Sequence, residues 1–510
     1  MTDLLTPTIA APFLAALVVL ALPQRAKRTI RFVSLAGALV PCATSVLLLA
    51  WYDASRGGFQ FVTSLPLIPK LGLSWHMGVD GIAVPLVFLT AVIHLTSVFT
   101  SWNLKEREKE FFLFVALLVT GVYGVFISLD LFLFFLFYEL AVLPMYVLIG
   151  IWGSSMPIDG QGPFRSLFAK VGVGRKEYGA MKLTLYLLAG SAFILVGILM
   201  LWVEGGRQLG AGTFDYVALS DANFRGGLGR TLFLLFYIGF GVLAGIWPFH
   251  TWSPDGHAAA PAAGSMLHAG VLMKLGAYGV LRVGFGLLPE ATHDLAWLVG
   301  LVAVINIIYG ALGAGWQKDI KYLIAYSSVS HMGIVMLGMA TLNEAGITGS
   351  VYQMVAHGMM TALFFALVNL VYNISHVRDM TKMGGFAHRM PGIGTFFVIA
   401  GLSSLGLPGL AGFVAEFLVF LGTWSSAHPW WLVPGVVGAF ITALYVLRAV
   451  RTIFLGPAPA EAAALRDARG VEWASFVILS AALVVLGVWP RLILTPLNAG
   501  VADFLARLGD

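Results

Sequence analysis

The sequence has few of the residues on which disulfide-bonded, redox and water-soluble proteins depend. Its 510 residues include one cysteine, Cys42, which excludes an intramolecular disulfide and a cysteine-rich iron–sulfur motif. Only 11% of the residues are charged, against about a quarter in ordinary soluble domains, whereas 59% are hydrophobic. This composition predicts that lipid, and not water, surrounds most of the chain.

Long apolar runs recur between short polar breaks along the whole chain. A helix needs about 20 apolar residues to cross a bilayer. The runs predict an all-α integral membrane protein, one polytopic domain over 1–510 with about fourteen transmembrane helices. The N-terminus is acidic and lacks the positive start of a cleavable signal peptide, so we expect the first run to be a retained helix. The expected spans are 4–22, 31–51, 80–101, 111–128, 131–152, 181–203, 230–249, 263–286, 294–315, 321–340, 344–373, 392–424, 430–450 and 472–490.

The basic residues are distributed unevenly among the connections between these spans. Alternate connections, beginning with Arg25, Lys27 and Arg28, hold most of the 30 Lys and Arg residues. Positive residues favour the cytoplasmic side, so an even number of spans predicts that both termini lie on the outer side. No connection is long enough for a soluble catalytic domain, and no basic patch suits nucleic acid.

Two long apolar stretches are interrupted by proline and glycine. The stretch 230–262 contains GIWPFHTWSPDGH, with Pro248 and Pro254, and 392–424 contains SSLGLPGLAGF, with Pro408. Proline removes a backbone donor and clashes with the preceding turn, so each helix is expected to break there. Such a pair points to inverted repeats around an ion site near the membrane midplane. Ordinary proline kinks are the alternative.

Five ionisable residues lie inside the expected spans. Each is costly in lipid unless it faces the bundle interior, a partner or water. A mobile carboxylate beside a buried lysine can switch the lysine between holding and releasing a proton, and histidine suits a proton relay. The alternatives are a structural ion pair for the charged residues and hydrogen-bonded core positions for the histidines. The five residues are Glu139, Lys274, His331, His357 and Glu416.

Motifs of soluble catalysis are absent from the sequence. It contains no Gly-x-Ser-x-Gly elbow, no HExxH metal motif and no GxxxxGK[ST] phosphate loop. His250 and His257 lie seven residues apart with Asp255 between them, which fits no common metal site. We expect these two histidines to have a role in the loop or the helix break.

Four stretches of the sequence together identify a family. They are LFLFFLFYELAVLPMYVLIGIWG, WPFHTWSPDGHAAAPAAGSMLHAGVLMKLGAYGVLR, QKDIKYLIAYSSVSHMGIV and GLPGLAGFVAEF. These stretches resemble those of the antiporter-like membrane subunits of respiratory complex I, the proton-translocating NADH:quinone oxidoreductase. The resemblance covers essentially 80–455. Within the family, the chain length and the stretches GVDGIAVPLVFLT and YNISHVRDMTKMGG are most similar to the chain M, or chain 4, type.

The resemblance implies a fold and a division of the chain. Spans four to eight and nine to thirteen would form two inverted five-helix repeats, each with a broken helix. The N-terminal helices would occupy 1–110, the first repeat 111–286, the second repeat 294–456, and a C-terminal helix and tail 457–510.

The resemblance also implies a role for each of the five ionisable residues. Glu139 would be the carboxylate of the fifth helix, Lys274 the central lysine, His331 and His357 the relay histidines, and Glu416 the terminal acid. Protons from the cytoplasm would reach Lys274, cross to Glu416 and leave outward.

The resemblance places cofactors and partners outside this chain. NADH, FMN, iron–sulfur clusters and quinone would be bound by partner subunits, and the neighbours would be L-type and N-type antiporter-like chains. The location would be the inner, or cytoplasmic, membrane of a bacterium. Three alternatives remain: a subunit of an Mrp-type cation/proton antiporter, the membrane arm of a related hydrogenase or dehydrogenase, and a structural spacer without pumping. Buried charges argue against the spacer, because apolar replacements would stabilise an idle bundle.

One position departs from the family pattern. The family usually has a lysine five residues before the proline that matches Pro248, and this chain has Leu243 there. His268, six residues before Lys274, stands where the family usually has an aliphatic residue. We expect His268 to supply the missing base and to pair with Glu139. A histidine that only packs between helices is the alternative.

Overall fold

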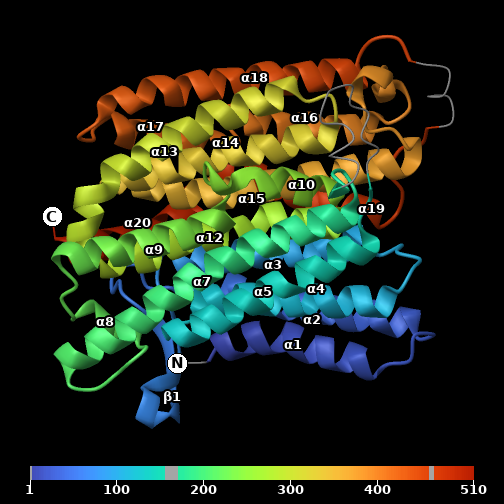
Figure 1. The fold of residues 1–510 in the computed structure, drawn as a ribbon. Helices are drawn as coiled ribbons and strands as arrows, with labels where there is room; N and C mark the ends of the chain where they lie inside the picture. The colour runs from blue at the N-terminus through green and yellow to red at the C-terminus, as the bar shows by residue number, and fades with distance from the viewer. Residues whose placement is uncertain (1–2, 156–170, 459–464, 510) are drawn as a thin grey trace.

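The chain folds into a bundle of long helices that lie side by side (Figure 1). The computed structural model describes residues 3–155, 171–458 and 465–509. The longer helices are α1 (Leu5–Ala21), α2 (Lys27–Trp51), α3 (Ala83–Thr100), α4 (Glu108–Ile127), α5 (Leu131–Trp152), α7 (Lys176–Leu209), α9 (Gly226–Ala244), α13 (Pro289–Trp316), α14 (Ile320–Ala340), α15 (Glu344–Ser375), α16 (Pro391–Ser404), α17 (Ala411–Trp424), α18 (Leu432–Phe454), α19 (Glu472–Val488) and α20 (Arg491–Leu508).

Shorter elements connect them or interrupt a span. One span consists of two α-helical and two π-helical segments in succession. The shorter elements are the antiparallel hairpin of β1 (Gln60–Ile68) and β2 (Leu73–Val79), α8 (Tyr216–Ser220), α10 (Trp252–Ala259), α11 (Ala262–Leu267), the π-turn η3 (His268–Leu272), α12 (Met273–Gly279) and the π-turn η4 (Val280–Phe285).

The helices have the length and composition that a bilayer requires. In the described ranges, ten helices are long and apolar enough to cross a membrane, or eleven if the bent pair α19 and α20 forms one span. Three further apolar helices, α1, α16 and α17, are shorter. Every stretch expected to span contains helix, and the predicted all-α membrane fold is confirmed.

The outer surface of the bundle is apolar, as contact with lipid requires. On α18, Val433, Phe440 and Leu444 are 66%, 63% and 55% exposed, whereas Gly438 and Thr442 face the interior. A soluble protein rarely exposes so continuous an apolar row. In lipid, exposing this apolar row has no free-energy cost. Polar groups find no hydrogen-bond partners in lipid, so they are placed in the interior.

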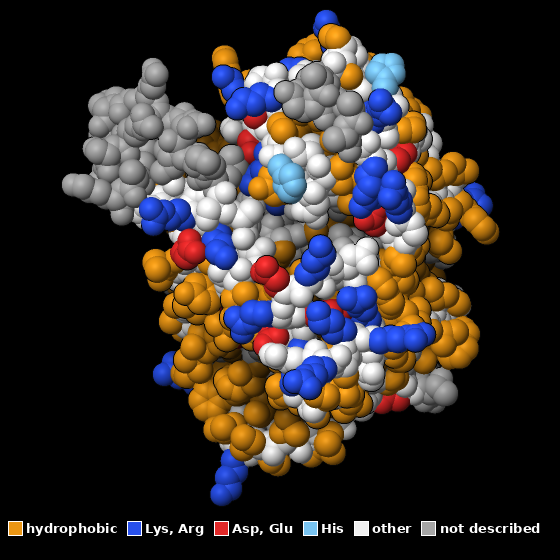
Figure 2. Space-filling model, turned by 90° about the vertical axis from the view of Figure 1, so that its right-hand side faces the viewer, with side chains coloured by type: hydrophobic (Ala, Val, Ile, Leu, Met, Phe, Trp, Pro, Cys, Tyr) orange, Lys and Arg blue, Asp and Glu red, His pale blue; other side chains and the backbone are white. Residues whose placement is uncertain are grey.

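Basic side chains gather at one end of the bundle (Figure 2). The connections after α1, α3, α13 and α15 lie at this end, as do the C-terminal ends of α5 and α18, and we call it the basic end. Arg31 forms an ion pair with Glu108 there, and Arg378 Nε lies 3.0 Å from Asp319 Oδ2. The two chain termini lie toward the opposite end (Figure 1). The structure thus separates the charges as the sequence predicts.

Two aspartates show an inverted relation between the halves of the bundle. Asp130 begins α5 and Asp319 begins α14, and each side chain accepts hydrogen bonds from the backbone N–H groups two and three residues later. Each also forms an isolated β-bridge, Asp130 with Asp215 before α9, and Asp319 with Asp379 before α16. Asp319 lies at the basic end, and Asp130 binds the hairpin at the other end. This correspondence agrees with the inverted repeats predicted from the broken helices.

The two expected helix breaks are present. The first helix ends at Ala244, where Gly245 has φ +73°, and the chain resumes as α10 at Trp252. The second break lies between α16 and α17 and contains Gly406 and Gly409, with φ +69° and +94°. Only glycine adopts these values at little cost. Pro254 does not interrupt a helix, because it lies in the first turn of α10, where no backbone donor is needed.

Two regions differ from the sequence-based expectation. The polar connection before the third span contains the hairpin β1–β2, whose outer residues leave the bundle (Figure 1). The C-terminal tail expected after the last span is the helix α20, bent by 67° from α19. The sequence did not indicate this second helix, because α20 is amphipathic and only mildly apolar, so it carries no continuous hydrophobic run.

Gly276→Ala is expected to destabilise the bundle by about 1–3 kcal/mol. A Cβ atom at this position of α12 would collide with the backbone of α9, at Phe240 O and Ala244 N. Gly284→Ala is the matched control, because its Cβ would have only Phe236 at 4.0 Å. Thermal unfolding of the detergent-solubilised protein tests this, and equal midpoints for the two variants would contradict it.

Candidate functional site

Lys274 on α12 lies fully buried near the centre of the bundle. Its Nζ donates to the carbonyl of Ala269 and lies 2.7 Å from Nδ1 of His357 on α15. Ala269 belongs to the π-turn η3, which shifts the backbone pairing just before the lysine. The lysine therefore has hydrogen-bond partners but, within the described ranges, no carboxylate in an ion pair with it.

Two buried histidines continue from Lys274 toward the second broken helix. The rings of His357 and His331 have centroids 5.2 Å apart. His331 Nδ1 lies 3.1 Å from Gln353 Nε2, and His331 Nε2 lies 3.2 Å from Ser404 Oγ. Since Ser404 ends α16, the histidine of α14 contacts the helix break directly.

Glu416 closes this series of contacts. Its Oε1 lies 3.5 Å from Nδ1 of His331, and the residue is only 6% exposed. A Cβ atom at Gly406 would lie 2.8 Å from Glu416 Oε2, so the backbone of the break covers the carboxylate. Lys274, His357, His331 and Glu416 thus form one connected row, and all four were identified from the sequence.

Glu139 lies apart from this row. It is half-buried on α5, and its Oε1 has no hydrogen-bond partner among the described residues. Ser191 of α7 lies beside it. The structure therefore leaves the predicted role of Glu139 as a prediction.

His268 is fully buried in η3, a turn that contacts α5. Neither of its ring nitrogens has a partner in the part of the chain that the structure describes, and no hydrogen bond joins it to Glu139. Leu243, at the position of the absent lysine, packs its backbone against Gly276, two residues after Lys274. The substitution of His268 for that lysine stays a prediction.

His257 has a central position that the sequence did not reveal. It lies in α10, fully buried, with its ring centroid 3.9 Å from that of His268 and 5.3 Å from Phe365. Lys274 Nζ donates to the carbonyl of Ala269, the residue that follows His268. No sequence spacing indicates this contact, because the turn at Pro261 brings the two helices together. His250, its partner in the sequence motif, packs separately on Tyr309.

The row has the chemistry of a proton relay. An amine, two imidazoles and a carboxylate follow one another, each able to accept and release a proton, and the hydroxyl of Ser404 lies against one of the imidazoles. Across 3–155, 171–458 and 465–509, no three His, Cys, Asp or Glu side chains gather as metal ligands would.

Comparisons with known proteins agree with this geometry. A family described as "NADH:quinone oxidoreductase/Mrp antiporter, TM" matches residues 166–442. NAD(P)H-quinone oxidoreductase chain 4 2 of Thermosynechococcus vestitus is 38% identical over 89% of this chain and 82% of its own. NADH-quinone oxidoreductase subunit M of Rhodobacter capsulatus is 34% identical over 96% of this chain and 94% of its own. A chain of respiratory complex I from Thermus thermophilus superposes with a TM-score of 0.86 and 26% identity, covering 99% of this chain and all of that one.

Gly406→Ala is expected to displace the carboxylate of Glu416, because the added Cβ would crowd Oε2. Gly409→Ala is the control: it has the same positive-φ penalty of about 1 kcal/mol, but nothing lies within 4 Å of its Cβ. Both variants should lose similar thermal stability. Only Gly406→Ala should change the rate at which a hydrophobic carbodiimide modifies Glu416, measured by peptide mass spectrometry. Equal rates in both variants would contradict the prediction.

Proposed function

Because this chain belongs to the NADH:quinone oxidoreductase/Mrp antiporter family and is a membrane subunit of the chain 4, or subunit M, type, we propose that it carries one proton channel. Quinone reduction in partner subunits would supply the free energy. The chain itself is then a non-redox translocase subunit of an enzyme complex. An Mrp-type antiporter subunit would share this fold, but the relatives at 34–38% identity carry quinone oxidoreductase names.

The row from Lys274 to Glu416 is the observation that carries this proposal. It joins a helix of the first half of the bundle to the second broken helix through His357 and His331. Each group changes its charge when it gains or loses a proton. That change of charge alters the free energy of protonating the neighbouring group in the row. Transfer runs from Lys274 to Glu416, and Glu416 releases the proton beyond the break.

The proposed orientation places the basic end in the bacterial cytoplasm. Positive residues gather at that end (Figure 2), and both termini lie toward the opposite end, which would be the periplasmic side. NADH, FMN, iron–sulfur clusters and quinone would bind to other subunits. The neighbours in the membrane would be L-type and N-type antiporter-like chains.

Lys274→Met and Glu416→Gln should each reduce proton pumping coupled to quinone reduction by about tenfold or more, because a positioned acid or base typically contributes about 10²-fold or more. The measurement is proton uptake against quinone reduction in inverted membrane vesicles that contain the assembled complex. Lys70→Met, in the exposed hairpin turn, is the control and should pump normally. Normal pumping by both channel variants would refute the path.

His268→Leu tests whether this histidine replaces the lysine absent at Leu243. We expect proton pumping and quinone reduction to fall together in the assembled complex, because the variant lacks the imidazole that would act as a base in addition to Lys274. His94→Leu is the matched control, since His94 is an equally buried histidine on α3 that packs on Tyr123. If both variants pump normally, His268 only packs between helices.

A further inference from the structure

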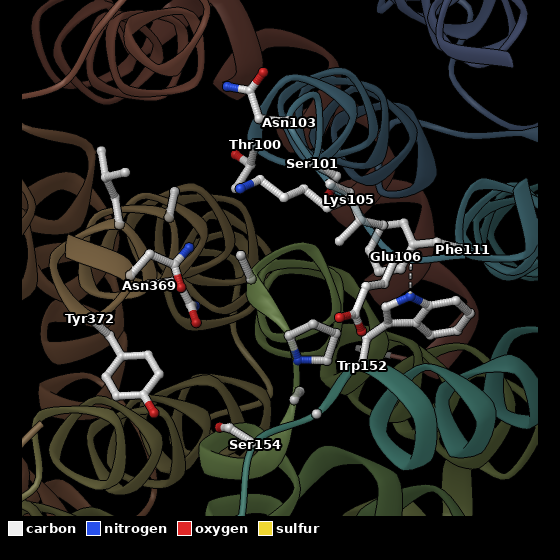
Figure 3. Close-up of a pocket in the computed structure, with 18 of the residues that line it drawn as sticks. Thr100, Ser101, Asn103, Lys105, Glu106, Phe111, Trp152, Ser154, Asn369 and Tyr372 are labelled. Carbon is white, nitrogen blue, oxygen red and sulfur yellow. Dashed lines mark hydrogen bonds between the residues drawn. The ribbon is translucent and has the colours of Figure 1, made fainter. Parts of the chain in front are cut away.

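A cavity of about 670 Å³ faces the basic end of the bundle, between α3, α5, α11, α14, α15 and α19. Figure 3 shows Asn369 and Tyr372 on one side of it, and Lys105, Glu106 and Trp152 on the other. At about 30 Å³ per molecule, it has room for roughly twenty waters. Its wall mixes amide, hydroxyl and charged groups with aromatic rings, so water can occupy it.

Lys321 lies in the wall of this cavity and is only 1% exposed. Its Nζ donates to Ala260 O at 3.2 Å. Asp319, two residues earlier, is already engaged, because it caps α14 and forms an ion pair with Arg378. The amine also lies at the N-terminus of α14, where the helix dipole disfavours a positive charge.

Asp255, which contacts the neighbouring Tyr322, is engaged as well. Asp255 Oδ2 lies 2.7 Å from Lys182 Nζ, and its Oδ1 accepts a hydrogen bond from the Tyr322 hydroxyl at 2.9 Å. No ion pair to Lys321 exists among the residues that the structure describes. Lys321 can therefore gain or lose a proton without breaking an ion pair. Lys182 cannot, because it is paired with Asp255.

A polar connection leads inward from Lys321. The carbonyl of Ala260 accepts a second hydrogen bond, at 3.3 Å, from the hydroxyl of Ser265, which also lies 3.1 Å from His257 O. The buried rings of His257 and His268 follow, with centroids 3.9 Å apart. The next residue, Ala269, accepts a hydrogen bond from Lys274 Nζ, so this series of residues leads from the cavity toward the row that ends at Glu416.

We propose that this cavity is the vestibule through which protons enter from the basic end, and that Lys321 takes them up. This proposal rests on the proposed function. A hydronium ion in the cavity transfers its proton to the neutral amine of Lys321 and leaves water. The resulting ammonium then gives a proton, across the Ser265 region, to an imidazole nitrogen of the His257 and His268 pair, which restores the amine.

Two substitutions of Lys321 distinguish a lysine that exchanges protons from one that only supplies a positive charge. Lys321→Met removes the group, and Lys321→Arg keeps a positive charge that does not dissociate. We expect both to lower pumping and coupled quinone reduction about tenfold in inverted vesicles, with the complex assembled normally. Lys318→Met, an exposed lysine three residues away, should have no effect.

The outcomes distinguish this proposal from the function on which it rests. Normal pumping by Lys321→Arg would show that the lysine supplies only charge, and would overturn the proposal. Normal pumping by both Lys321 variants, with loss in Lys274→Met, would leave the channel intact and reject this uptake route. Loss in neither Lys321 nor Lys274 variants would reject both.

Thiol labelling tests the vestibule independently of Lys321. In a Cys42→Ser background the described chain has no other thiol, and Asn373→Cys places one in the cavity wall. A bulky, membrane-impermeant thiol reagent added at the cytoplasmic face should label it and lower pumping. Lys382→Cys, exposed at the same end outside the cavity wall, should be labelled without loss of pumping. Absent labelling of Asn373→Cys, or labelling with full pumping, would overturn the proposal.

Discussion

The contact between Lys274 and His357 is the interaction on which the interior of this bundle depends. A buried lysine in a membrane protein is costly unless its donors are used, and here the π-turn carbonyl of Ala269 and the imidazole of His357 use them. The contact joins α12 to α15, so it also fixes how the first part of the bundle packs on the second. The π-turn, the interrupted helices and the buried hydroxyl and amide groups all lie around it.

The broken helices are possible only because the bundle interior satisfies their free backbone groups. Asn306 on α13 accepts a hydrogen bond from Trp247 N at the first break and donates to Val329 O on α14, both at 2.8 Å. The buried side-chain amide of Asn306 thus forms hydrogen bonds with the backbone at the first break and with the backbone of α14. Trp247 and Leu407 at the two breaks are exposed at the surface of this chain, but the free backbone N–H of Trp247 has its partner in the interior. The second break, through Gly406, brings the backbone directly over Glu416.

The sequence predicts those features that depend on local composition. Apolar length predicted the spans, proline and glycine predicted both breaks, and the cost of charge in lipid identified Lys274, His331, His357 and Glu416. Features that depend on packing between distant segments were not predictable. The contact between the rings of His257 and His268 arises from the turn at Pro261, the hairpin β1–β2 has no long apolar run, and α20 is amphipathic without a continuous apolar run.

The two interrupted helices differ in what lies next to them. The first leads to a lysine and a pair of histidines, and the second to a glutamate. The contacts from Lys274 through His357 and His331 to Glu416 cross from the first half of the chain to the second. Neither half is interchangeable with the other, and a chain divided between α12 and α13 would leave the base in one product and the acid in the other.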